Sequence, residues 1–301
     1  VRRCHGDLHL GNVCLVDGAP TLFDAIEFNE GFAWIDVLYD VAFLLMDLEH
    51  RDLRAMSNAF FNRYVAVTDD VAGLACLPLF LSARAMVRAK VAVSTAQAVP
   101  ARREALRAEA RAYFDAALRY LTPQVPTLVA VGGLSGTGKS TLAARLAPLV
   151  GVAPGAVHLR SDVLRKRQFG VAETDRLPQS AYTEAASRRV FETMFEMAET
   201  ALAAGHGVVV DAVFGDRWQR EGLADIAART GARWRPIWLK ADTAMLVSRV
   251  AARVGDASDA TPAVVRRQAS NVTAPDDWPS LSSGGGPDSV VTAARQMLGD
   301  L

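Results

Sequence analysis

The sequence predicts an α/β protein of two domains: a mainly helical segment over residues 1–123, then a parallel sheet with flanking helices over 124–301. A glycine-rich segment from Gly133 to Thr141 lies between a β-type apolar run and a helical run. After it, apolar runs that end in polar residues alternate with helical patterns. Before it, Pro123 and Pro126 interrupt the last helix of the first segment, which places the domain boundary there.

The composition is that of an ordinary globular chain. Half of the 301 residues are hydrophobic, and 33 Lys and Arg balance 33 Asp and Glu. The balance favours neither a nucleic-acid nor a membrane partner. Cys4, Cys14 and Cys76 form no CxxC pair, so they predict no disulfide framework and no zinc site. A reducing, cytoplasmic location fits best.

The apolar runs of the sequence are too short to predict a membrane span. Arg84, Arg88 and Lys90 interrupt the longest apolar candidate, so no run reaches the roughly 18 residues of a membrane span. The chain begins at Val1 inside a motif, without an initiator methionine or a signal-peptide pattern. We therefore expect a fragment of a longer protein.

The first candidate site lies near the N-terminus. Residues 5–12 have the spacing HxDxxxxN, and Asp24 follows an apolar run twelve residues after Asn12. The alternative is a polar turn after a strand. The pattern resembles the aminoglycoside phosphotransferase and choline kinase family, which is related to protein kinases. That resemblance implies Asp7 as catalytic base and Asn12 and Asp24 as magnesium ligands.

The helical segment from Trp34 to about Leu121 resembles the same family, in which an Asp opens a buried helix behind the site. Asp36 and Asp40 are expected to brace the loop there rather than to do chemistry. Such kinases also need an N-terminal lobe that holds the nucleotide, and this sequence has none upstream of Val1. Residues 1–123 therefore resemble a C-lobe fragment, and we expect no activity from this half alone.

The segment from Gly133 to Thr141 fits the P-loop pattern GxxxxGK[ST] at every fixed position. A strand that turns into a helix here directs backbone N–H groups and the positive helix end at one anion. Lys139 would hold the terminal phosphates of ATP, and the Ser140 hydroxyl would bind Mg²⁺. The alternative is a flexible glycine turn, which the flanking strand and helix disfavour. The residues expected to bind ATP are Gly133, Ser135, Gly136, Thr137, Gly138, Lys139, Ser140 and Thr141.

Two carboxylates follow buried strands in this half. Asp162 comes after the run 156–159, and Asp211 closes the run 208–210. Loops at the carboxyl ends of parallel strands are where α/β proteins bind ligands. Asp162 is expected to act as general base or as an outer magnesium partner, and Asp211 to hold Mg²⁺ as a Walker B residue. A helix N-cap is the alternative for Asp211, and which carboxylate is the base stays open.

Charged residues near these strands supply further candidates. Arg165 and Lys166 could bind an anionic substrate or simply begin a helix. Arg249 and Arg253 lie one helical turn apart after the fourth strand, before a polar hinge over 254–261. They are expected to close as a lid over the transferring phosphate, with a surface arginine pair as the alternative. A fifth strand is expected over 278–282.

From about Val125 to Leu301 the chain resembles the small P-loop kinases, such as gluconate kinase, shikimate kinase and the zeta-toxin type. It is most similar to a kinase domain fused behind an aminoglycoside-phosphotransferase-like domain in bacterial proteins. The resemblance implies a P-loop kinase-like parallel sheet and a Mg²⁺- and ATP-dependent phosphotransferase for a small-metabolite hydroxyl. Two alternatives remain: a regulatory ATP-binding module, and an aminoglycoside or choline kinase that uses the N-terminal half with a missing lobe. The sequence sets neither the acceptor nor the oligomeric state.

Overall fold

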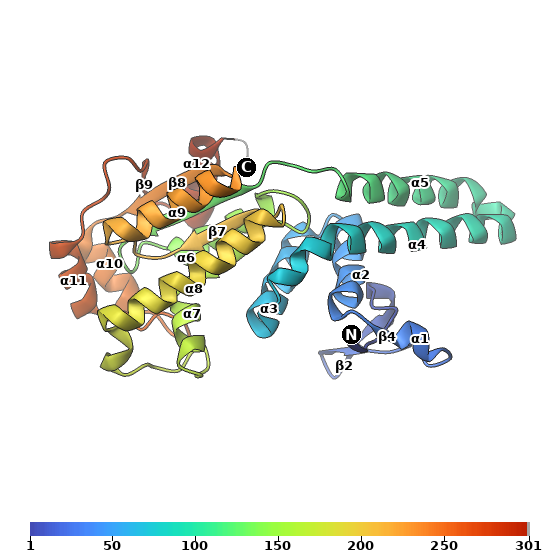
Figure 1. The fold of residues 1–301 in the computed structure, drawn as a ribbon, viewed down its shortest axis with the longest axis horizontal. Helices are drawn as coiled ribbons and strands as arrows, with labels where there is room; N and C mark the ends of the chain where they lie inside the picture. Colours follow the sequence, from blue (N-terminus) through green and yellow to red (C-terminus); the bar gives the residue numbers. More distant parts are fainter. Residues whose placement is uncertain (300–301) are drawn as a thin grey trace. The chain divides into compact units, whose positions relative to one another are not determined.

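The computed structural model describes residues 1–299, and the chain divides into two compact units, Val1–Gln124 and Val125–Leu301 (Figure 1). The division falls within the stretch that holds Pro123 and Pro126, where neither helix nor strand forms. Proline lacks a backbone N–H and fixes φ, so it ends the preceding helix.

Unit 1 is mainly helical. Its helices are α1 (Glu30–Ala33), α2 (Val37–His50), α3 (Arg54–Thr68), α4 (Leu77–Ala98) and α5 (Arg103–Tyr120). Two antiparallel strand pairs precede the long helices: β1 (Arg2–Arg3) with β4 (Trp34–Ile35), and β2 (Val13–Val16) with β3 (Ala19–Leu22). Helices α4 and α5 lie side by side along most of their length (Figure 1). The helical segment expected from Trp34 begins at Val37, because Trp34 and Ile35 pair with β1.

The expectation that no stretch of the chain is long and apolar enough to span a membrane was wrong for the segment that contains helix α4. Residues Ala72–Ala98 are long and apolar enough to do so by length and composition alone. In this structure Arg84 is only 6% exposed, and its Nη2 lies 3.7 Å from the Asp40 carboxylate. The guanidinium also lies 3.8 Å from the Tyr39 ring centroid. The apolar faces of α4 pack against α2 and α5 within the unit.

Unit 2 is a five-stranded parallel sheet with helices on both faces, which confirms the predicted α/β class. Its strands are β5 (Thr127–Gly133), β6 (Val157–Arg160), β7 (Val208–Asp211), β8 (Arg233–Lys240) and β9 (Ser280–Ser282). Its helices are α6 (Lys139–Leu146), α7 (Ser161–Gln168), α8 (Glu184–Ala203), α9 (Arg217–Thr230), α10 (Thr243–Ala251), α11 (Pro262–Asn271) and α12 (Pro287–Leu298). The fifth strand starts two residues later than expected, and the residue just before it, Pro279, has no N–H to donate to a ladder.

The strand order, β6-β7-β5-β8-β9, brings the predicted site residues together. Strand β5 lies in the centre and is buried throughout. Its Val131 pairs with Asp211 of β7, and Asp211 pairs with Arg160 of β6. The carboxyl ends of these strands therefore lie next to one another. In open α/β sheets, ligands bind in the crevice outside the carboxyl ends of the strands, at the point where the strand order reverses.

Two different cores hold the sheet in place. Helices α6 and α12 cover one face, where Leu146 and Leu298 belong to the same aliphatic core as Val129 of β5. Helices α8 and α9 cover the other face. There Phe191 and Trp218 meet edge to face, with ring centroids 5.4 Å apart. Four of the five tryptophans lie in unit 2, so tryptophan fluorescence mainly reports on this unit.

Candidate active site

The loop between β5 and α6 has a backbone that only glycine adopts easily. Gly136 has φ 87°, and a Cβ there would lie 2.8 Å from the Leu246 carbonyl oxygen. Gly138 has φ 86° and forms the N-cap of α6. Both conformations strain L-residues. The loop can therefore turn its N–H groups and the positive end of α6 towards one bound anion.

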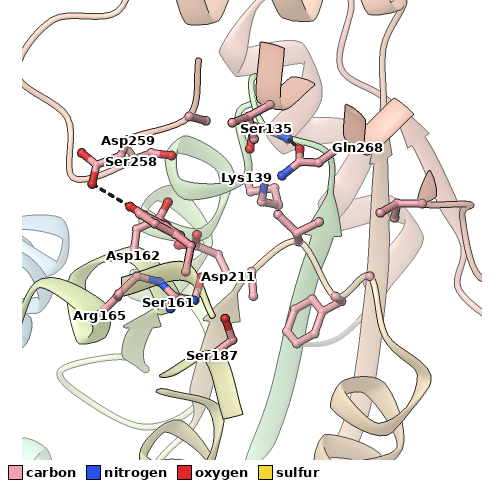
Figure 2. A pocket seen from close by; sticks show the side chains of 18 of the residues that line it. Ser135, Lys139, Ser161, Asp162, Arg165, Ser187, Asp211, Ser258, Asp259 and Gln268 are labelled. Carbon is pink, nitrogen blue, oxygen red and sulfur yellow. Dashed lines mark hydrogen bonds between the residues drawn. The ribbon is translucent and has the colours of Figure 1, made fainter. Parts of the chain in front are cut away.

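A cavity of about 850 Å³ opens at this edge of the sheet (Figure 2). Its walls come from the P-loop, α7, the start of α8, the chain after β7, the segment 253–261 and α11. The structure brings most of the predicted residues to it: Ser135, Gly136, Gly138, Lys139, Ser140, Thr141, Asp162, Asp211 and Arg253. Gly133 and Thr137 support the loop instead. Gly133 packs against Leu239, and the Thr137 hydroxyl donates to the Leu134 carbonyl at 2.8 Å.

Lys139 is the first residue of α6. Its Nζ donates to the Leu134 carbonyl oxygen at 3.0 Å. Burial lowers the pKa of Lys139, and the charges of Asp211 and Asp162 act in the opposite direction. A buried ammonium gains most from an anion that replaces its lost water, so phosphate binding at this point would stabilise the charged form.

Asp211 holds both of its oxygens in hydrogen bonds. The Ser140 hydroxyl donates to Oδ1 at 2.9 Å, and His158 Nε2 lies 2.7 Å from Oδ2. Burial alone would raise the pKa of Asp211, but His158, together with the charge of Arg160, brings it below its usual value. The carboxylate therefore stays ionised over the neutral range.

The Ser140 and Asp211 oxygens fit a magnesium ion, which prefers oxygen ligands. Among residues 1–299 no group of three or more His, Cys, Asp or Glu side chains could hold a metal. Magnesium in a P-loop needs few protein ligands, because phosphate oxygens and water complete its shell. The sequence interpretation missed His158 and Arg160. They alternate on β6 and so share one side of the strand, beside the strand that carries Asp211.

Asp162 lies in the first turn of α7 and faces the same cavity (Figure 2). Burial raises the pKa of Asp162, although a hydrogen bond from Ser258 and the charge of Lys139 act to lower it. Asp162 and Asp211 thus have pKa shifts of opposite sign. Such a difference assigns different protonation roles to two neighbouring carboxylates.

Lys166 does not bind substrate in this arrangement, because it is 1% exposed and paired inside the protein. Its Nζ lies 2.7 Å from both oxygens of Asp259. Asp259 also accepts from the Tyr182 hydroxyl at 2.6 Å and from the Leu177 N–H at 3.0 Å. This pair joins α7 to the polar segment 254–261.

Replacing Lys166 with Met should lower the free energy of unfolding of unit 2 by about 1.5–3 kcal/mol, the range for one hydrogen bond to a charged group, because the partly buried Asp259 would lose its cation but keep its bonds to Tyr182 and Leu177. Urea unfolding followed by tryptophan fluorescence measures the change. Lys240→Met, at an exposed end of β8, is the matched control and should shift the free energy of unfolding by less than about 0.5 kcal/mol. A loss below about 1 kcal/mol for Lys166→Met would show that water already screens the pair.

Arg165 is also buried, at 8% exposure, but it lines the cavity. Its Nη1 donates to the Ala181 carbonyl at 2.7 Å, and the guanidinium lies 5.0 Å from the Tyr182 ring centroid. Within residues 1–299 its buried Nε has no hydrogen-bond partner. A buried donor without a partner costs free energy unless a ligand supplies one.

The two expected lid arginines do not lie on the same helix. Helix α10 ends at Ala251, so Arg253 lies beyond the last turn and lines the cavity. Arg249 instead donates to the Ser283 carbonyl at 2.8 Å and to the Gly136 carbonyl at 3.5 Å. Because helical spacing stops before Arg253, the expectation that both side chains point to one side was wrong.

In unit 1 the predicted residues Asp7 and Asn12 precede strand β2, and Asp24 follows strand β3. The Asn12 side-chain amide donates to both the carbonyl and a carboxylate oxygen of Asp7, each at 3.0 Å. Asp24 follows Phe23, whose N–H donates to the Asn12 carbonyl at 3.1 Å. The bracing role expected of Asp40 is confirmed, because it accepts the N–H groups of residues 5 and 6 at 2.9 and 3.0 Å.

Asp36 acts differently from Asp40. It caps α2 by accepting the Leu38 N–H at 2.8 Å. This bond satisfies one of the unpaired donors at the start of the helix. Asp36 therefore has a structural role, as expected, but it acts on the helix rather than on the loop.

Comparison with known proteins gives a family match and relatives. Residues 128–275 match a family described as AAA domain. Uncharacterized proteins from Mycobacterium tuberculosis and Mycobacterium bovis are 34% identical over 261 residues, which covers 85% of this chain and 51% of each relative. The chain therefore spans about half the length of the curated relatives it matches.

Solved structures with similar folds include two kinases. A gluconokinase from Sinorhizobium meliloti 1021 is 20% identical with a TM-score of 0.43, covering 58% of this chain and 93% of its own. An APS kinase from Mycobacterium tuberculosis, solved with AMPPNP and APS, is 18% identical with a TM-score of 0.41, covering 58% and 99%.

Proposed function

We propose that unit 2 is a Mg²⁺- and ATP-dependent phosphotransferase that acts on a hydroxyl group of a small metabolite. One observation carries this proposal: Asp162, with a raised pKa, faces the same cavity as Lys139 and the Ser140–Asp211 pair. A module that only binds nucleotide needs the loop and its lysine. It does not need a second carboxylate suited to take a proton.

Asp162 is the better candidate for the base. Both oxygens of Asp211 are already engaged, and its pKa is lowered, so it is a poor proton acceptor. Asp162 has a raised pKa, which brings its proton affinity closer to what a general base needs near neutral pH. These observations favour Asp162 in the choice that the sequence left open.

In the proposed reaction the acceptor oxygen forms a bond to the γ-phosphorus, and the bond from that phosphorus to the β,γ-bridging oxygen breaks. Asp162 takes the acceptor proton, and the electron pair of the broken bond leaves with ADP. Lys139 and the loop N–H groups hold the β and γ phosphates, and Arg253 faces the same space. Magnesium, held by Ser140 and Asp211, would offset phosphate charge when bound.

The acceptor itself should carry an anionic group. Arg165 is buried at the cavity wall with an unpaired Nε, and a carboxylate or phosphate would satisfy it. The cavity wall also includes the rings of Phe191, Phe214 and Trp218, which favour an apolar portion in the ligand. The proposed substrate class is therefore a small hydroxylated anion.

The experiment is transfer of labelled γ-phosphate from ATP to a pooled extract of small metabolites, followed by separation of organic from inorganic phosphate. We expect label in an organic product. Label found only as slowly released inorganic phosphate would support the regulatory ATP-binding module instead. Label in neither form would exclude both readings.

The remaining assignments are proposals of the same kind. The partners are ATP and a small-molecule acceptor, without nucleic acid or membrane, in the cytoplasm. The three cysteines are free, which fits a reducing compartment. In a longer parent protein, unit 1 could act as an aminoglycoside or choline-type kinase through Asp7, Asn12 and Asp24. The bond between Asn12 and Asp7 supports this second function, and loss of activity in Asp7→Asn of the full-length parent would test it.

A further inference from the structure

The P-loop is tied to a helix far away in the sequence. The Ser135 N–H donates to the side-chain Oε1 of Gln268, on α11, at 2.9 Å. The two residues are 133 positions apart. Gln268 also lines the cavity. Neither the motif nor the spacing of the sequence pointed to this residue.

The bond to Ser135 fixes which way the Gln268 amide faces. A glutamine amide has one accepting oxygen and one donating NH₂ group. A backbone N–H requires the oxygen, so the NH₂ group must face away from Ser135. Figure 2 shows the amide nitrogen turned to the side on which Lys139 lies.

The Gln268 amide nitrogen has no hydrogen-bond partner in the part of the chain that the structure describes. Within residues 1–299 the only hydrogen bond found for the Gln268 side chain is the one its oxygen accepts. On the other side of the same peptide group, the Lys139 Nζ donates to the Leu134 carbonyl oxygen at 3.0 Å. Because the Gln268 nitrogen is turned to the side on which Lys139 lies (Figure 2), donors from α11 and α6 border the part of the cavity next to the P-loop lysine. An anion with several oxygens matches such a set of donors.

We propose that Gln268 contacts the terminal phosphate of the bound nucleotide: Ser135 holds its oxygen, and its NH₂ group donates to the γ-phosphate. The inference rests on the proposed function, because it requires ATP in the P-loop. ADP lacks the group that Gln268 recognises. Helix α11, which follows the polar segment 254–261, would therefore contact bound ATP through Gln268 but would not make this contact with bound ADP.

The test compares binding of a non-hydrolysable ATP analogue and of ADP, each with Mg²⁺, by calorimetry on the whole chain. No acceptor is needed. Gln268→Met should lower affinity for the analogue about 10- to 100-fold, the range expected for one hydrogen bond to a charged group, and change ADP affinity less than about twofold. Gln268→Glu keeps an oxygen for Ser135 but places a negative charge where the donor was. It should weaken analogue binding at least as much.

Gln296→Met, the same change at an exposed position of α12, is the control and should leave both affinities unchanged. Equal losses for ADP and the analogue in Gln268→Met would show that Gln268 only tethers the loop, and would overturn the inference. So would wild-type analogue affinity in Gln268→Glu. A wild-type chain that binds neither nucleotide would instead overturn the proposed function, and this inference with it.

Discussion

Replacing Asp162 with Asn should lower the rate of phosphate transfer by about 10²- to 10⁴-fold, the usual contribution of a general base. The two side chains have nearly the same shape, so the change removes the proton acceptor and little else. ATP affinity should change by less than about threefold, because Lys139 and the loop hold the phosphates. Initial rates of labelled phosphate transfer and a separate binding measurement distinguish the two effects.

The pH dependence supplies a second readout. Asp162 must be ionised to accept a proton, so activity should fall as the pH falls through its pKa. Burial raises the pKa of Asp162, and the charge of Asp211 adds to this effect. A hydrogen bond from Ser258 and the charges of Lys139 and Arg165 lower the pKa but do not cancel the rise. The fall should therefore begin at a higher pH than an ordinary aspartate would give, and it should be missing from the residual activity of Asp162→Asn.

Asp225→Asn, on the exposed side of α9, is the matched control and should leave the rate unchanged. Equal labelling by the wild type and Asp162→Asn would remove Asp162 as the base. An unchanged acidic limb in the variant would do the same.

Lys139→Ala should lower turnover by about 10²- to 10³-fold, the cost of removing one charge-stabilising donor from a phosphate or oxyanion site. The Nζ of Lys139 is held over the loop by the Leu134 carbonyl, so it is already placed where phosphate binds. Weaker ATP binding should accompany the loss. Calorimetry and initial rates measure both quantities.

Lys240→Ala removes an exposed lysine from the same unit and should leave ATP binding and turnover unchanged. Wild-type ATP affinity and turnover in Lys139→Ala would place the nucleotide elsewhere. In that case the P-loop reading of residues 133–141 would be wrong.

Short-range patterns predicted much of unit 2. The strand, glycine turn and helix around Lys139 are encoded within about fifteen consecutive residues, so their geometry follows from local rules. Asp162 and Asp211 were found because each ends or follows a buried run. In a parallel sheet those ends share one edge.

Contacts between segments that are distant in the sequence could not be predicted from the sequence. Whether Lys166 meets substrate or Asp259 depends on how the segment 254–261 folds back, and no local pattern records that. The same holds for Gln268, which meets the P-loop only in three dimensions. Arg249 and Arg253 were misjudged because the helix was assumed to continue past Ala251.

The most direct measurement of the function of this chain is transfer of labelled γ-phosphate by the wild type, Lys139→Ala and Asp7→Asn in parallel. If unit 2 carries the activity, the wild type and Asp7→Asn should label an organic product equally, while Lys139→Ala labels about 10²-fold less or none. Labelling that survives Lys139→Ala but is lost in Asp7→Asn would contradict this and assign the chemistry to unit 1.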